Sequence, residues 1–257
     1  MRVTLLGTGT STGVPVPTCC CSVCTSDDPR DNRLRPSALL EWPGASLLID
    51  TSTDLRQQAL RYRIERIDAV LYTHAHADHM LGLDELRLYN WRQKGVIPVF
   101  GNPTTLDALT QTFWYVFSDK PAESTKPEID RRLVDRPFEL LGRQIIPVPL
   151  LHGTLPILGF RIGKMAYLTD VSEIPHESYG LLNDLDTLIL SALRERPHPT
   201  HLTVEQAVET AKRIGARRTL FTHMSHEVHH ATIAAQLPSG IELAYDGLIV
   251  EIDDDQP

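Results

Sequence analysis

The chain has 257 residues and a formal net charge of -8, from 33 acidic residues and 25 lysines and arginines. This length can bury a full core, and we expect a single domain over residues 1–257. The acidic balance argues against a large nucleic-acid footprint, because proteins that neutralise many phosphates carry a basic surface. No apolar run approaches the roughly 18 residues needed to span a bilayer, and no leader pattern is visible, so we expect no membrane contact and a cytoplasmic location.

The first half of the chain alternates strand and helix patterns. Met1 to Leu6 reads as a strand, and a glycine-rich turn follows it up to Gly13. Neither a helix pattern nor the lysine of a nucleotide-binding loop comes next, so we interpret this segment as a tight turn. The next expected elements are strands at 38–41 and 46–49, a helix at 54–62, a strand at 70–73, a helix at 83–91, a strand at 97–100 and a helix from 104.

The second half continues this alternation. Residues 118–137 are polar and punctuated by prolines, which predicts a surface excursion or lid. Thr203 and Gln206 form the capping box of a predicted helix. The expected strands lie at 144–150, 159–162, 165–168, 187–190, 219–222 and 248–252.

One short segment carries the strongest chemical signal. After the apolar run that ends at Tyr72, the sequence Thr73-His74-Ala75-His76-Ala77-Asp78-His79 brings together three imidazoles and a carboxylate. Both groups are good ligands for Zn²⁺, Mn²⁺ or Fe²⁺. His74 and His76 can point the same way from an extended segment, while Asp78 and His79 turn toward a neighbouring position as a helix begins. The segment therefore predicts two adjacent metal ions.

Three more ligand-type side chains follow strands in the second half of the chain. His152, Asp170 and His223 each come directly after an apolar strand pattern. Sites on layered α/β sheets gather at the carboxyl ends of the strands. We therefore expect these three residues to join the first motif.

In this order, the residues resemble the ligand motif of the metallo-β-lactamase superfamily, and the resemblance covers nearly the whole chain. It implies an αββα sandwich of the α/β class, with a dinuclear site at one edge of the two sheets. Aspartate at position 170, where the zinc β-lactamases have cysteine, resembles the hydrolases of phosphodiesters, thioesters and lactones. The implied ligands are His74, His76 and His152 for one ion, Asp78, His79 and His223 for the other, and Asp170 as the bridge.

The four cysteines predict a further metal site. They fall within six residues, which is too close for a convincing disulfide framework. Cys19, Cys21 and Cys24 form a C-x-C-x₂-C knuckle that would hold a structural Zn²⁺ with one more ligand. Cys20 is an extra thiol, and the sequence leaves open which of Cys19 and Cys20 joins Cys21 and Cys24.

The remaining ligand is implied by a resemblance to one branch of the superfamily, the phosphoribosyl cyclic phosphodiesterases of bacterial phosphonate breakdown. His226 resembles the fourth zinc ligand of that branch. The residues at 6–9, 82–87, 222–226 and 246–247 also resemble it. The resemblance implies a homodimer as well.

The same branch implies a catalytic role for His201, which resembles a histidine beside the substrate phosphate. An imidazole with a pKa near neutrality can protonate or hydrogen-bond a departing ribose oxygen. His198 is a nearby competitor for this role.

Together these features predict a dinuclear phosphodiesterase that acts on a small phosphate diester, preferably a ribose cyclic phosphate or a related nucleotide diester. Asp78 and His201 are the candidate catalytic residues. A nuclease of the tRNase Z type is the main alternative, although no long basic, glycine-rich arm is evident. A thioesterase or lactonase is disfavoured by the cysteine knuckle and His201, and a non-catalytic scaffold has no need for all seven ligands.

Overall fold

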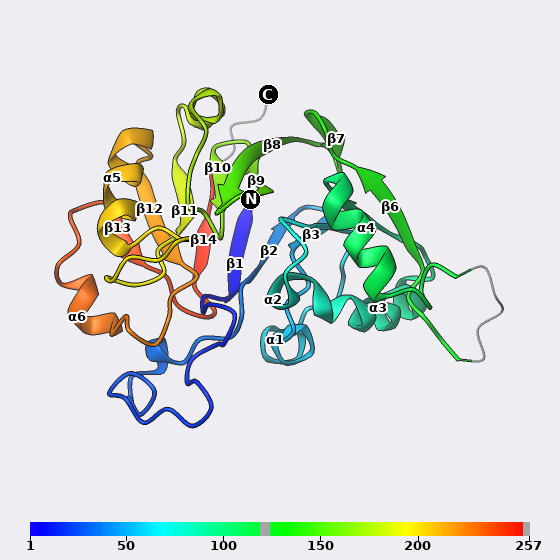
Figure 1. Cartoon of the computed structure of the whole chain (residues 1–257). Helices are drawn as coiled ribbons and strands as arrows, with labels where there is room; N and C mark the ends of the chain where they lie inside the picture. Colours follow the sequence, from blue (N-terminus) through cyan, green and yellow to red (C-terminus); the bar gives the residue numbers. More distant parts are fainter. Residues whose placement is uncertain (119–123, 254–257) are drawn as a thin grey trace.

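The computed structural model describes residues 1–118 and 124–253, which form two seven-stranded mixed sheets (Figure 1). The first sheet has the strand order β14-β1-β2-β3-β4-β5-β6, and the second has the order β13-β12-β11-β10-β9-β8-β7. The first sheet contains β1 (Arg2–Gly7), β2 (Ser37–Trp42), β3 (Ala45–Ile49), β4 (Ala69–Leu71), β5 (Ile97–Gly101), β6 (Ile129–Leu133) and β14 (Ile249–Glu251). The second contains β7 (Phe138–Leu140), β8 (Arg143–His152), β9 (Leu155–Ile162), β10 (Met165–Leu168), β11 (Thr187–Ser191), β12 (Arg218–Thr222) and β13 (Ile241–Leu243).

Helices cover the outer face of each sheet. The first sheet is covered by α1 (Leu55–Tyr62), α2 (Ala77–Met80), the 3₁₀ helix η2 (Leu81–Glu85), α3 (Leu86–Gln93) and α4 (Pro103–Thr112). The second is covered by α5 (Val204–Ile214) and α6 (His230–Ala234), with η3 (His176–Leu182) beside them. A further 3₁₀ helix, η1 (Pro29–Asp31), lies in the loop before β2.

Three apolar clusters hold the four layers together. Side chains such as Leu40 and Phe160 meet between the two sheets. In α5, Val204, Ala207 and Ala211 recur on one helical face and pack on the outer face of the second sheet. Because both faces of each sheet are buried, the inner strands are continuously apolar rather than alternating. The αββα architecture expected from the sequence is confirmed.

Strand direction brings the predicted site residues to one edge. Strands β3 to β6 run parallel in the first sheet, and β10 to β13 run parallel in the second. Strand β8 is parallel to β10, since both pair antiparallel with β9. Within the second sheet the carboxyl ends of β8, β10 and β12 therefore point the same way, and each of them, like β4 in the first sheet, leads into a segment with candidate ligands.

The structure differs from the sequence-based elements in a few places. Strands β6, β7 and β13 were not predicted. Strand β6 lies inside the 118–137 stretch that was interpreted as a surface excursion, and residues 119–123 of that stretch are outside the described part of the chain. As an edge strand with mostly exposed, charged side chains, β6 lacks an apolar pattern. The helix predicted at 83–91 is divided into η2 and α3. No helix of the described residues is long and apolar enough to cross a membrane.

Candidate metal centre

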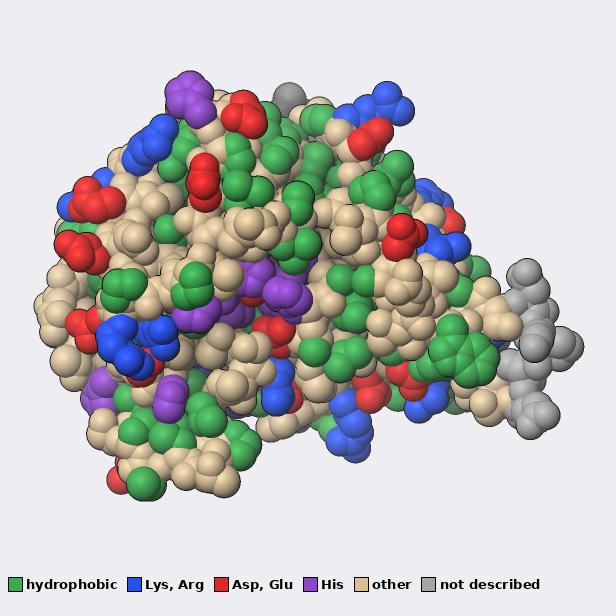
Figure 2. Space-filling view, in the orientation of Figure 1, with side chains coloured by type: hydrophobic (Ala, Val, Ile, Leu, Met, Phe, Trp, Pro, Cys, Tyr) green, Lys and Arg blue, Asp and Glu red, His purple; other side chains and the backbone are tan. Residues whose placement is uncertain are grey.

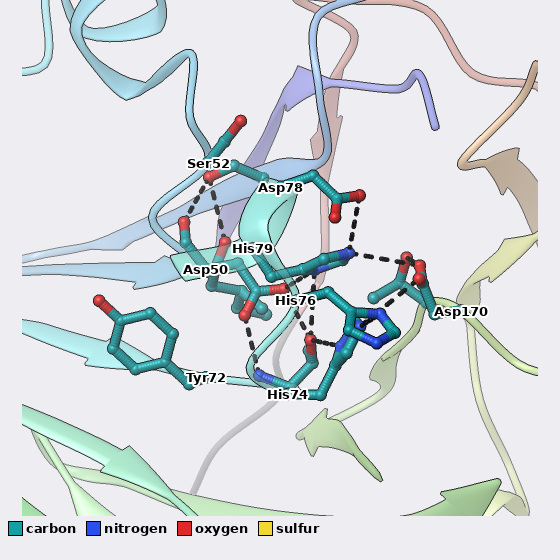
Figure 3. Close-up of polar contacts among 12 residues, drawn as sticks. Asp50, Ser52, Tyr72, His74, His76, Asp78, His79 and Asp170 are labelled. Atoms are coloured by element: carbon teal, nitrogen blue, oxygen red, sulfur yellow. Dashed lines mark hydrogen bonds and ion pairs between the residues drawn. The ribbon is translucent and has the colours of Figure 1, made fainter. Parts of the chain in front are cut away.

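The loop between β4 and α2 carries the first group of candidate ligands (Figure 3). His74 and His76 lie in the loop itself, and Asp78 and His79 lie in α2. Thr73 anchors the loop at its start, because its carbonyl oxygen accepts a hydrogen bond from the backbone N–H of Leu158 in β9 at 3.0 Å. This bond ties the loop of the first sheet to a strand of the second.

All seven predicted ligands come together at the edge of the two sheets. Their ligand atoms form two groups, in each of which the atoms lie within 4.8 Å of one another. Asp170 belongs to both groups. His76 is exposed at the mouth, whereas the other six side chains are buried. Figure 2 shows the histidine side chains gathered in a hollow at the centre of this face. The groups are His74, His76, His152 and Asp170, and Asp78, His79, Asp170 and His223.

Several buried polar atoms of this cluster lie close together but make no well-aligned hydrogen bond. They include Asp78 Oδ2, His79 Nε2 and His223 Nε2, the last of which lies 2.8 Å from Asp170 Oδ1. His79 Nε2 lies 3.3 Å from Asp78 Oδ2 and 3.4 Å from Asp170 Oδ1. Orphaned polar atoms in a buried site carry a free-energy cost. A divalent cation held among them would satisfy all three, so these residues fit the metals that the motif implies.

The charges within the cluster also favour a bound cation. Burial alone would lower the pKa of His223, but the Asp170 carboxylate, 2.8 Å from His223 Nε2, helps to raise this pKa to about 9. Burial alone would raise the pKa of Asp170, but the charges of His223 and His79 hold it well below its usual range. On the other side of the cluster, burial keeps the pKa of His74 well below its usual value, which leaves a neutral imidazole suited to metal binding.

The backbone is strained at three strand ends beside the cluster. Asp50, Asp170 and His223 adopt left-handed φ angles of 61°, 56° and 57°. This conformation is uncommon outside glycine and persists where the surrounding structure enforces it, often at functional sites. Asp50 and His223 come directly after a strand, and Asp170 comes two residues after one. Each of the three side chains lies in or beside the cluster.

Asp50, which follows β3, is the site residue that the sequence analysis missed. It is fully buried, and its Oδ2 accepts a hydrogen bond from His79 Nδ1 at 2.7 Å. The backbone N–H and the hydroxyl of Thr73 also donate to its carboxylate, each at 2.8 Å. A carboxylate in this position fixes the His79 tautomer and leaves Nε2 directed at the cluster. The signal in the sequence was a polar residue after an apolar strand, as for Asp170.

His201 lies over the cluster. Its ring centroid is 4.6 Å from that of His152 and 5.1 Å from that of His223, on which it stacks. Burial, together with the charge of His223, lowers the pKa of His201 to about 3, so its imidazole is neutral at pH 7 in the metal-free chain. A neutral imidazole can still donate a hydrogen bond, whereas proton transfer would need an anionic phosphate nearby to raise this pKa. His198 lies farther out, with its centroid 5.0 Å from that of His201.

The cysteine knuckle is a separate cluster. The Sγ atoms of Cys19, Cys21 and Cys24 lie 3.2, 3.5 and 3.6 Å from His226 Nδ1. The backbone N–H of Cys24 points at Cys21 Sγ and lowers the pKa of this thiol to about 6. Cys20 is exposed and outside the cluster. The geometry therefore brings Cys19, rather than Cys20, together with the other two cysteines.

Comparison with known proteins identifies the family. Residues 46–224 match the Beta-lactamase superfamily domain, which is more than half of the chain. The chain belongs to this superfamily. Membership supports a metal-dependent hydrolase, and the cluster of histidines and aspartates is suited to divalent metal ions.

Three similar proteins span almost all of the chain. The crystal structure of a new diphosphatase from the PhnP family shares 44% sequence identity, with a TM-score of 0.92 and 98% of both chains covered. An octanoyltransferase of Porphyromonas gingivalis is 41% identical over 258 residues, or 99% of this chain but 52% of that protein. The chain thus spans about half the length of this relative. A ribonuclease Z of Mycobacterium avium is 25% identical over 98% of this chain and 99% of its own length.

Proposed function

We propose that the protein is a dinuclear metal-dependent phosphodiesterase that hydrolyses a small phosphate diester, with a ribose cyclic phosphate or a related nucleotide diester as the preferred class. The observation that carries this proposal is the pair of ligand groups that share Asp170, with His201 stacked over them. The similarity to a diphosphatase from the PhnP family also supports phosphoryl chemistry.

In this proposal, the two groups hold one divalent ion each, Mn²⁺ or Zn²⁺ or alternatively Fe²⁺. Such ions, when bound, lower the pKa of water and neutralise the oxygens of a phosphoryl group. Cys19, Cys21, Cys24 and His226 hold a structural Zn²⁺, because three thiolates and one imidazole make a closed tetrahedral set.

The side chains of the chain itself have three further tasks. Asp78 and Asp170 set the negative charge of the site, and Asp50 orients His79. His201 is placed to donate a hydrogen bond to the leaving oxygen from the side of His152 and His223. The loop that carries His201 is fixed by His152, whose Nδ1 donates to the carbonyl oxygen of Thr200 at 2.7 Å.

Two other substrate classes are favoured by particular relatives. Similarity to the ribonuclease Z of Mycobacterium avium supports an RNA substrate, but the net charge of -8 is unfavourable for binding a large polyanion. The octanoyltransferase of Porphyromonas gingivalis favours an acyl thioester, although the similarity covers only about half of that protein.

A substrate panel tests the proposal. It contains a ribose cyclic phosphate, 2′,3′-cyclic nucleotides, bis(4-nitrophenyl) phosphate, a precursor tRNA, a lactone and an octanoyl thioester. We expect the small diesters to have the highest kcat/KM, and Asp170→Ala to lower it by several orders of magnitude. Asp184→Ala, an exposed carboxylate away from the cluster, is the matched control. Dominant turnover of tRNA, lactone or thioester would replace the proposed substrate class.

The wider organisation of the protein belongs to the same proposal. A core shared by both sheets supports one domain over residues 1–257. Free cysteines are typical of a reducing compartment, which supports a cytoplasmic location. We also propose a homodimer, for which the exposed Leu60, Leu88 and Trp91 offer an apolar surface, and analytical ultracentrifugation tests it.

A further inference from the structure

Arg33 is a buried cation outside both clusters. Its side chain has no exposed surface, and it lies at the base of the loop that contains the cysteines. Arg33 and Val14 close this loop with two backbone hydrogen bonds of 2.8 Å each. In Figure 1 the loop, in dark blue, lies against the orange segment that leads into α6.

The guanidinium group of Arg33 holds the backbone on both sides of His226. Nη1 donates to the carbonyl oxygen of Ser225 at 3.0 Å, and Nη2 donates to that of Val228 at 2.7 Å. Nη2 also contacts the buried Asp31 carboxylate at 2.9 Å. Asp31 Oδ1 in turn accepts the backbone N–H of His230 at 2.8 Å. The buried ion pair of Arg33 and Asp31 therefore forms hydrogen bonds with the backbone of residues 225, 228 and 230.

The same segment begins with a ligand of the other cluster. His223 precedes Met224, whose backbone N–H donates to the carbonyl oxygen of Thr8 at 2.9 Å. The backbone N–H of Ser225 donates to the carbonyl oxygen of Leu193 at 2.9 Å. Residues 223–228 are thus held by the first turn and by the second sheet on one side, and by Arg33 on the other. Because only two residues separate His223 from His226, a shift of this segment can reach both histidines.

We propose that Arg33 is a positioning residue that fixes residues 223–228, and so sets His223 in the dinuclear cluster and His226 in the cysteine cluster. This inference rests on the metal sites of the proposed function. Packing alone would not require an arginine here, because burying a charged pair costs free energy that apolar side chains of similar volume avoid. The planar guanidinium suits the task, since its donors form a rigid fork that binds several acceptors at fixed angles.

Substitution of Arg33 in the full-length protein, loaded with Co²⁺ as a spectroscopic probe, tests this role. Arg33→Met removes the fork, and Arg33→Lys keeps a positive charge beside Asp31 in case the first variant fails to fold. Arg30→Met is the matched control, because Arg30 is an exposed arginine paired with Asp28. The readouts are the chelator-competition affinity of each cluster, the thiolate-to-cobalt absorption band, and thermal unfolding of the metal-free protein.

We expect both Arg33 variants to weaken metal binding at both clusters by roughly 10- to 100-fold, the usual effect of removing a group that orients a ligand. The thiolate-to-cobalt band should also change shape as the His226 nitrogen is displaced, while the control matches the wild type. Lower thermal stability with unchanged affinity at both clusters would mean that Arg33 only stabilises the fold. Weaker binding at the cysteine cluster alone would overturn the link to His223. If the wild type shows no thiolate band, the proposed cysteine site is wrong, and the affinity of the dinuclear cluster alone decides the role of Arg33.

Discussion

Replacing Asp50 with asparagine should weaken the metal centre without touching a metal ligand. The carboxylate receives three hydrogen bonds, from His79 Nδ1 at 2.7 Å and from the backbone and hydroxyl of Thr73 at 2.8 Å each. Asp50 Oδ1 accepts the backbone N–H of Thr73, and Oδ2 accepts both the Thr73 hydroxyl and the N–H of His79. An amide has only one oxygen, so when that oxygen accepts the backbone N–H of Thr73, its NH₂ group faces the N–H of His79. In the flipped orientation the NH₂ group faces the backbone N–H of Thr73 instead. The loss of one charge-assisted hydrogen bond is worth about 1.5–3 kcal/mol, which corresponds to roughly a 10- to 100-fold change.

The assay is metal affinity by competition with a chelator, followed by kcat for a diester with both ions at saturation. We expect Asp50→Asn to lower affinity by that factor, while the circular dichroism spectrum stays unchanged. Asp68→Asn is the control, because Asp68 also accepts a backbone N–H, from Ser46, but precedes β4 at the opposite end of the strand. An affinity and a kcat equal to those of the wild type would refute the idea that Asp50 orients His79.

Three further outcomes follow from the geometry. In the metal-free protein His223, with a pKa of about 9, carries a proton at pH 7.5, so metal binding should release this proton. Calorimetry in buffers of different ionisation enthalpy should show the proton release decreasing as the pH rises through about 9, and a release that does not change with pH would contradict this expectation. Thr203→Ala removes the capping box of α5 and should cost about 1 kcal/mol, or a fall in Tm of roughly 2–4 °C, and an unchanged Tm would show the cap to be dispensable. Gly82→Ala places a Cβ 2.2 Å from the carbonyl oxygen of Ser52 and should destabilise the fold by about 1–3 kcal/mol in urea unfolding, whereas Gly180→Ala meets no neighbour and should not.

The clustering of the candidate ligands could be predicted from the sequence because the chemistry of metal binding restricts the residue types. Imidazole, carboxylate and thiolate are few, and their positions after apolar strands predict which edge they share. The same logic placed His152, Asp170 and His223, which are far apart in the chain but end strands that run in one direction. The capping box could also be predicted from the sequence, since it depends only on Thr203 and Gln206, three positions apart.

Edge strands were harder to predict. Strands β6, β7 and β13 lie at the edges of their sheets, where a strand has one neighbour and carries more polar side chains. The sequence of β6 is mostly charged, and β7 and β13 alternate apolar and charged residues over only three positions, which is too short a run to mark a strand. The sequence also could not decide whether Cys19 or Cys20 joins Cys21 and Cys24. Adjacent residues differ only in the direction that the folded loop gives to their side chains.

Residues that support the ligands are hidden for a different reason. Asp50 and Arg33 act on backbone amides, carbonyl oxygens and one ring nitrogen, groups that impose no sequence pattern on their partners. A single aspartate after a strand, or a single arginine in a loop, is too common to stand out. Two chains that share every metal ligand are therefore expected to differ in metal affinity where the groups that orient the ligands differ. In this chain, substitutions at positions 33 and 50 therefore test the strength of the metal sites while every candidate ligand stays in place.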